Sequence, residues 1–273
     1  MKETDFENTD IGKIPRDWEV KSIAEVSEII IGGTPKTSVG EYWNGKIPWI
    51  AIEDINNGDR FISKTNKKIT KKGLTESSTK ILKKNSIIIS ARGTVGMVAQ
   101  LEKDMAFNQS CYGLIGIKDN ITNDFLYYSL KDKIELLKRR THGSVFDTII
   151  KDTFKNIYIF VPKKNEQEKI TKILSSLDYK IELNNKINRT LEKIGETIFK
   201  HWFIDFEFPD KNGNPYKSSG REMIESELGM IPKGWKVGVI KDVANLTMGL
   251  SPKSSSYNTN YRGLPLLNGA VRF

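Results

Sequence analysis

The side chains with the clearest chemistry are basic and cluster in the first third of the chain. Eight lysines lie between positions 64 and 84 around a single acid, Glu76. A lysine that neutralises a DNA phosphate releases counterions, so this pattern predicts contact with a nucleic-acid backbone; a solvated loop face is the alternative. The lysines assigned to this contact are Lys64, Lys67, Lys68, Lys71 and Lys72. A second basic run adds Arg139 and Arg140, which could instead be cations at a helix C-terminus.

Three short polar segments carry side chains suited to contacting bases. Gly32–Thr37 and Ser90–Gly96 are glycine-containing turns, and Phe107-Asn-Gln-Ser110 is a third segment. Arginine is the usual bidentate partner of guanine, and asparagine or glutamine that of adenine. The candidates for base contact are therefore Arg92, Asn108 and Gln109, each of which could alternatively hold its own turn together. The remaining candidates on the turns are Thr34, Lys36, Thr37 and Thr94.

No catalytic pattern accompanies these binding features. The sequence has no Gly-x-x-x-x-Gly-Lys-Ser/Thr phosphate loop, and Asn214-Pro-Tyr216 lacks the second proline of the adenine methyltransferase tetrapeptide. One cysteine and two distant histidines make a zinc site improbable. We therefore expect a chain that is not an enzyme and that has no metal and no cofactor of its own.

Composition and charge favour a globular protein with a polyanionic partner. Of the 273 residues, 38% are hydrophobic and 28% are charged, and the formal net charge is +9. The apolar runs are far shorter than a membrane span, and no signal peptide opens the chain. The expected compartment is the cytoplasm.

The two ends of the chain repeat one another. The segment 11–20 aligns with 228–237, an offset of 217 residues, and the match continues without gaps to Pro48 and Pro265. A period of this length is too long for a solenoid and indicates duplication of a whole domain with its connector. The second copy stops at Phe273, so we expect residues 228–273 to be the truncated start of a second unit.

The first unit, residues 1–162, mixes short apolar runs with glycine, proline and asparagine. Residues 19–31 begin with alternation and end in an apolar run, and the pattern of residues 125–138 predicts a helix. The other segments expected to be strands are 48–52, 86–90, 111–117 and 156–161. Together they predict an α/β (α+β) domain large enough to bury its own core.

Residues 163–208 have the pattern of one long helix. Asn165 is the expected N-cap with Glu168 at the capping-box position, and apolar residues recur every three or four positions. A helix of about 36 residues would be roughly 54 Å long and suits a coiled-coil seam; one side of an intradomain bundle is the alternative. The seam comprises Leu177, Ile181, Asn184, Ile187, Leu191, Ile194 and Ile198. Asn184 is either a buried amide that fixes the register or a solvated position. Residues 209–227 are a polar linker.

Taken in order, these motifs resemble the specificity subunits of type I restriction-modification systems. The resemblance rests on Gly12–Trp18 and its repeat Gly229–Trp235, Gly33–Lys36, Ser90–Gly96, Phe107–Ser110, Pro162–Ile181, Phe199–Phe206 and Asn212–Tyr216. It covers nearly the whole chain; each motif alone is weak, whereas the ordered set is specific.

The resemblance implies a target-recognition domain that binds double-stranded DNA and a conserved helix on which methyltransferase subunits dock. It also implies restriction subunits as partners, with S-adenosylmethionine and ATP bound by those partners only. Family members have two recognition domains and two antiparallel helices, whereas this chain stops early in its second copy. We therefore expect a half-length subunit that forms a homodimer through its helix and reads an interrupted palindrome. The alternatives are the targeting domain of a sequence-specific endonuclease or modification enzyme, and a structural protein that uses the helix only for assembly.

Overall fold

The computed structural model describes residues 6–9, 12–55, 59–140, 148–253, 255 and 257. The chain divides into two units, Met1–Arg189 and Thr190–Phe273. The long helix α4 (Lys164–Phe199) belongs to the first unit up to Arg189. The boundary between the units therefore lies inside this helix.

Two main sheets form the frame of the first unit. The larger sheet has the order β4 (Ser27–Ile31), β12 (Cys111–Gly116), β9 (Ile87–Ser90), β10 (Val98–Leu101) and β6 (Phe61–Ile62). The smaller sheet has the order β7 (Lys67–Ile69), β5 (Trp43–Ile50), β11 (Met105–Phe107) and β8 (Ile81–Leu82). A further antiparallel pair joins β3 (Glu19–Ser22) to β13 (Tyr158–Val161). Only the β6–β10 and β5–β11 pairs are parallel among these strands.

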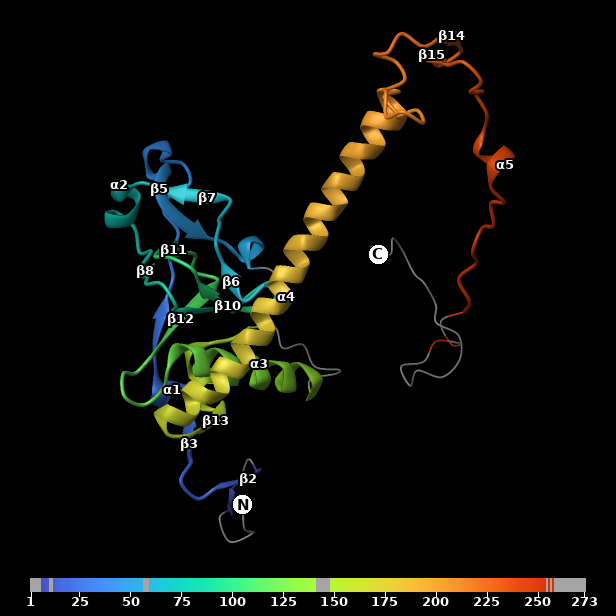
Figure 1. The fold of residues 1–273 in the computed structure, drawn as a ribbon. Coiled ribbons are helices and arrows are strands. Elements are labelled where there is room, and N and C mark those ends of the chain that lie inside the picture. The colour runs from blue at the N-terminus through green and yellow to red at the C-terminus, as the bar shows by residue number, and fades with distance from the viewer. Residues whose placement is uncertain are drawn as a thin grey trace. The chain divides into compact units, whose positions relative to one another are not determined.

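Three helical segments of the first unit lie over the larger sheet and at its ends: α1 (Ile23–Val26), α3 (Asn123–Arg140) and the first part of α4 (Figure 1). Helix α2 (Lys71–Thr75) instead packs beside β5 of the smaller sheet. Strand β9 separates two apolar clusters, because alternate side chains of a strand point to opposite faces. Ile87 and Ile89 pack in the cluster that contains Leu126 and Leu130 of α3, and Ile88 packs in the cluster that contains Phe107 of β11.

The mixed α/β domain followed by one long helix is confirmed, with two local corrections. Residues 19–31 form two strands separated by α1, because Ser22 and Glu25 make a capping box that starts a helical turn between them. The prediction of Asn165 as N-cap is wrong, since α4 already begins at Lys164 and the carbonyl oxygen of Lys163 accepts the first helical hydrogen bonds. None of the described helices carries an apolar stretch long enough to cross a lipid bilayer.

The repeat found in the sequence is also a repeat of local structure. Hairpin β1 (Phe6–Thr9) and β2 (Gly12–Pro15) pairs Thr9 with Gly12; hairpin β14 (Met223–Ser226) and β15 (Gly229–Pro232) pairs Ser226 with Gly229. In both hairpins a hydroxyl donates to the glycine carbonyl at 2.6 Å. The same 217-residue offset relates α1 to α5 (Ile240–Val243). Each hairpin is therefore built from the same contacts.

The two hairpins differ in what their tryptophans contact. Trp18 donates its indole N–H to a carboxylate oxygen of Glu166 at 3.2 Å, within the first unit. In the second unit, Trp235 stacks on Phe208 with ring centroids 5.6 Å apart and meets the edge of Phe206 at 5.5 Å. Phe208 and Phe206 follow a π-helical turn, Lys200–Ile204, at the end of α4. The second unit is thus organised around an aromatic cluster rather than a sheet.

Candidate nucleic-acid interface

The turns that carry the candidate base-contacting side chains meet at one end of the larger sheet. Strand β4 ends at Ile31, which pairs with Tyr112, and β9 ends at Ser90, which pairs with Cys111. Both strands run antiparallel to β12, which begins at Cys111. The turn after β4, the turn after β9 and the turn before β12 therefore leave the sheet on the same side.

Direct hydrogen bonds join these three turns. The Thr34 hydroxyl donates to the side-chain oxygen of Gln109, 75 residues away. The backbone N–H of Gly33 donates to the Phe107 carbonyl at 2.9 Å, and that of Ala91 donates to the Ser110 carbonyl at 2.8 Å. The structure thus brings together candidates that lie far apart in the sequence.

The glycine pair at 32–33 is required by the closeness of this contact. A Cβ atom at Gly32 would lie 2.0 Å from the carbonyl oxygen of Asn108, and one at Gly33 would lie 2.4 Å from the backbone nitrogen of Thr79. Both are well inside the distance at which any side chain fits. Gly32 therefore permits the close approach of the first turn to the third, and Gly33 permits its approach to the segment at Ser78 and Thr79.

The turn after β9 holds Arg92 out toward solvent. The Ser90 hydroxyl closes the turn, accepting from the Met97 N–H at 2.9 Å and donating to the Thr94 carbonyl. Gly93 adopts a left-handed conformation with φ of +70°. Arg92 and Thr94 are exposed, and no carboxylate of the described residues forms an ion pair with Arg92. Its guanidinium is thus available to an external acceptor.

Asn108 and Gln109 are engaged within the turns. The side-chain oxygen of Asn108 accepts from the Ser110 N–H at 3.1 Å, and that of Gln109 accepts from Thr34. These contacts match the alternative that both side chains hold their turns together. Gln109 is nevertheless exposed, whereas Asn108 is half-buried.

Two tryptophans missed by the sequence analysis attach the first turn to the smaller sheet. The indole N–H of Trp49 donates to the Gly33 carbonyl at 3.1 Å, and that of Trp43 donates to the Lys36 carbonyl at 3.2 Å. Their rings meet edge to face at 5.2 Å. Trp43 lay outside the strand expected over 48–52, so only the six-residue spacing of the two tryptophans hinted at a shared role. Lys36 and Thr37 remain exposed beyond this anchor.

Two of the predicted phosphate-contacting lysines lie on the strand next to β5, the strand that carries both tryptophans. Lys67 and Lys68 belong to β7 and pair with Trp49 and Pro48 of β5. Of the five predicted lysines, four are exposed and have no carboxylate partner among the described residues: Lys64, Lys67, Lys68 and Lys71.

Lys72 differs from the other four lysines because it is ion-paired with Glu41. The hydrogen bond from Lys72 keeps the pKa of Glu41 below its usual value, and the same bond raises the pKa of Lys72. This cation is already partly neutralised. The side chains of Arg139 and Arg140 lie outside the described residues.

Helix α4 has two faces of opposite character. The predicted seam, here called the apolar stripe, consists of Leu177, Ile181, Asn184, Ile187, Leu191, Ile194 and Ile198, all of them exposed. Leu177 and Leu191 are 58% and 59% exposed. The other face contacts the first unit mainly through polar side chains, beginning with the buried Gln167 and Thr171, and Ile170 packs against the core beside them. No described residue covers the apolar stripe, so Asn184 occupies a solvated position in a single chain.

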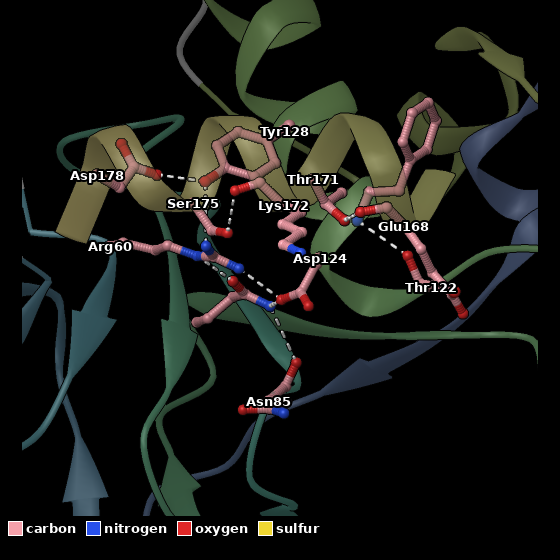
Figure 2. Close-up of polar contacts among 12 residues, drawn as sticks. Arg60, Asn85, Thr122, Asp124, Tyr128, Glu168, Thr171, Lys172, Ser175 and Asp178 are labelled. Carbon is pink, nitrogen blue, oxygen red and sulfur yellow. Dashed lines mark hydrogen bonds and ion pairs between the residues drawn. The ribbon is translucent and has the colours of Figure 1, made fainter. Parts of the chain in front are cut away.

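Further along, the polar face of α4 meets a cluster around Arg60, here called the junction (Figure 2). Arg60 is only 5% exposed, and its guanidinium donates to Gln100 at 2.6 Å, to the Tyr128 hydroxyl at 3.0 Å and to Asp124. The Tyr128 hydroxyl in turn donates to Asp178 of α4 at 2.6 Å. The junction therefore links the larger sheet, α3 and α4 through one guanidinium.

Burial and a neighbouring carboxylate both affect the pKa of Tyr128, the tyrosine of the junction. Desolvation first, and then its hydrogen bond to Asp178, raises the pKa of Tyr128 well above its usual value. Tyr128 therefore stays a neutral hydroxyl that can donate and accept at physiological pH. A pocket of about 490 Å³ lies beside it, lined by Arg60, Asp124, Lys172, Asp178 and Glu182 among others.

The chemical groups at the sheet end suit binding. Among the residues that the structure describes, no three His, Cys, Asp or Glu side chains form a group that could hold a metal ion. Cys111 lies at the start of β12, where burial raises the pKa of its thiol to about 12, so it is not a thiolate nucleophile at neutral pH. The turns instead present hydroxyl, amide and guanidinium donors, with lysines beside them.

Comparison with protein families gives one extended match. Residues 15–193 match the family model described as the type I restriction modification DNA specificity domain. The chain is 39% identical over 263 residues to the type I restriction enzyme MjaIX specificity subunit of Methanocaldococcus jannaschii, covering 94% of this chain and 59% of the relative. It is 30% identical to the MjaVIII specificity subunit of the same organism, covering 95% of this chain and 56% of the relative. The chain thus spans a little over half the length of these curated relatives.

Solved structures share the fold. The crystal structure of the HsdS subunit from Thermoanaerobacter tengcongensis has a TM-score of 0.51 at 19% identity, covering 67% of this chain and 43% of that chain. The S subunit of a type I restriction-modification system from M. genitalium has a TM-score of 0.52 at 20% identity, covering 71% and 46%. At these identities the likeness concerns the fold alone.

Proposed function

This chain belongs to the family of type I restriction modification DNA specificity domains, and we propose that it recognises a DNA sequence on behalf of partner enzymes. In this proposal, residues 1–162 form the recognition domain and read one half-site. The chain carries no catalysis itself. It acts in the cytoplasm with methyltransferase and restriction subunits, which bind S-adenosylmethionine and ATP.

The observation that carries this proposal is the convergence of three turns at one sheet end beside exposed lysines. Arg92 is exposed on the second turn, and Thr34 and Gln109 join the first turn to the third. Lys67 and Lys68 lie on the strand next to the one whose tryptophans anchor the first turn. Phosphate contacts position a protein on DNA and base contacts specify the sequence, so the two groups have complementary roles.

We further propose that the chain works as a homodimer through α4. The apolar stripe follows three- and four-residue steps along a helix and is exposed, as a coiled-coil seam without its partner would be. A second copy would cover it. In an antiparallel pair the first turns of the two helices lie at opposite ends, roughly 54 Å apart. This length is about one and a half turns of DNA, so two identical domains would read inverted half-sites of an interrupted palindrome.

The experiment is DNA binding by the chain together with its partner methyltransferase. The target is found by methylation-aware sequencing of the host DNA, and binding to that target is measured over a range of salt concentrations. We expect a palindromic motif and an affinity that falls steeply with salt. Equal binding to target and scrambled DNA would disprove sequence recognition, and an asymmetric motif would disprove the symmetric dimer.

A further inference from the structure

The contact between α4 and the recognition domain combines the packing of Ile170 against the core with a series of hydrogen bonds. Gln167, the first buried helix residue, accepts from the Thr122 N–H at 2.8 Å and donates to the carbonyls of Asn120 and Pro162 at 2.9 Å each. Further along the same face, Asp178 accepts from Tyr128 at 2.6 Å. Hydrogen bonds are directional, whereas apolar packing is not, so these contacts constrain the orientation of the helix as well as its proximity.

Arg60 occupies the central position of this contact. Its backbone N–H donates to Glu182 of α4 at 3.1 Å, while its side chain reaches Gln100 and Asp124 in the recognition domain. The guanidinium also lies 4.8 Å from the Phe61 ring centroid and 5.0 Å from that of Tyr128. The guanidinium is planar and its donors point in fixed directions. With acceptors on three sides, only one orientation of the guanidinium satisfies all of its hydrogen bonds.

The next ion pair along α4 also joins the helix to the loop that carries Arg60. Arg189 lies 3.8 Å from Asp59, the neighbour of Arg60. Loop residues 59–60 are therefore bound to α4 at Glu182 and at Arg189, about two helical turns apart. Two attachments at different points along the helix axis resist tilting of α4 on the domain, whereas a single attachment would allow the helix to tilt.

From this geometry we propose that Arg60 and Tyr128 are positioning residues that fix the angle of α4 on the recognition domain, and thereby the spacer length between half-sites. The proposal about spacing rests on the proposed dimer. A domain of this size has a radius of roughly 15 Å, so a tilt of about 15° shifts its DNA-contacting end by about 4 Å. Since base pairs are stacked about 3.4 Å apart, this shift corresponds to about one base pair of spacer.

The main test uses Tyr128→Phe, which deletes the hydroxyl shared by Arg60 and Asp178 and leaves the ring and the guanidinium in place. Tyr112→Phe is the matched control, because Tyr112 is half-buried and its hydroxyl has no hydrogen-bond partner among the described residues. Arg60→Lys, which keeps the charge and removes the planar fork, is a second variant. All are prepared as full chains and checked for unchanged circular dichroism.

Two measurements are made on each variant. The first is the distance distribution between spin labels at Lys80→Cys in the domain and Lys186→Cys on the helix, both exposed, in protein diluted with unlabelled chain. The second is binding to DNA duplexes whose half-sites are separated by spacers that differ by single base pairs. We expect a broader distance distribution for Tyr128→Phe and for Arg60→Lys. We also expect the preference for the best spacer to fall about tenfold, equivalent to about 1.4 kcal/mol, with half-site affinity retained.

An unchanged distance distribution in Tyr128→Phe would overturn the proposal. A broadened distribution with an intact spacer preference would overturn its link to DNA spacing. Failure of the unmodified chain to bind DNA contradicts the proposed function instead, and the distance measurement, which needs no DNA, still decides whether the junction fixes the helix.

Discussion

Placing charges on the apolar stripe of α4 should separate the proposed dimer into monomers. The perturbation is the double substitution Leu177→Asp with Leu191→Asp. Both side chains lie on the stripe, and neither contacts the core of the recognition domain, so the fold of each chain should persist. A loss of association can therefore be assigned to the stripe.

The magnitude follows from the exposure of these side chains. Complete burial of a leucine contributes about 1.5–3 kcal/mol, and the two leucines are 58% and 59% exposed, so about 1–2 kcal/mol per side chain remains to be gained. A symmetric pair contains four such side chains, which gives about 4–7 kcal/mol in total. At 1.4 kcal/mol per factor of ten, the dissociation constant should rise about 10³- to 10⁵-fold.

The assay is light scattering across a concentration series, with sedimentation equilibrium for the dissociation constants. The matched control is Tyr179→Asp with Lys193→Asp. Each substitution lies two residues beyond a substituted leucine and therefore about 200° further around the helix axis. The control variant therefore carries two aspartates at exposed positions away from the stripe. We expect this control to remain dimeric.

Two results would refute the reasoning. A wild-type chain that is monomeric at all concentrations would mean that a different chain covers the stripe. Equal dissociation of the control and the leucine variant would mean that added negative charge, rather than loss of the apolar surface, separates the copies.

Three further predictions concern DNA and chemistry. Lys67→Gln should weaken binding to all sequences alike and reduce the slope of log affinity against log salt by about 0.9, because one phosphate contact is lost. The control Lys72→Arg should leave that slope unchanged, since the cation and its pairing with Glu41 are kept. A slope unchanged by Lys67→Gln would place Lys67 away from the DNA. Arg92→Ala should cost roughly 1–3 kcal/mol of discrimination at one base pair, measured by competition between target and single-mismatch duplexes. Discrimination unchanged in a folded Arg92→Ala protein would show that the residue does not read a base. The purified chain alone should transfer no methyl group from labelled S-adenosylmethionine to target DNA, and transfer free of partner protein would contradict a purely recognitional role.

The elements that the sequence predicted best are those with strong local periodicity. The apolar steps from Leu177 to Ile198 identified α4, although the predicted helix 163–208 runs past its end at Phe199 and past the π-helical turn that follows. The pattern of 125–138 identified α3 to within two residues at each end. The helix start was missed because Asn165 is a good capping residue by type, whereas the chain turns into the helix immediately after Pro162 and Lys163. Residue type was a weaker guide than backbone geometry at this position.

The sequence predicted the three turns of the candidate site, but not that they meet. Glycines and polar residues indicated the three turns separately, but their meeting depends on β12 pairing between β4 and β9, which is a long-range choice. The junction was not predicted at all. Arg60 follows a polar Asn-Asn-Gly-Asp stretch typical of a solvated loop, and its partners Asp124 and Glu182 lie 64 and 122 residues further along. No local pattern distinguishes such an arginine from a surface one.

The matching hairpins at the two ends of the 217-residue unit have a consequence for inheritance. A segment that begins and ends with the same structure can be removed, duplicated or replaced, and the flanking chain meets an equivalent hairpin each time. A genetic crossover between the two matching stretches would therefore gain or lose one recognition domain together with its helix, and the helix would stay attached to its own domain through Arg60. Under the proposed function, replacement of this unit by another of the same kind would change the DNA sequence that is read while keeping a helix for assembly, so a new specificity would arise in a single step rather than by gradual substitution.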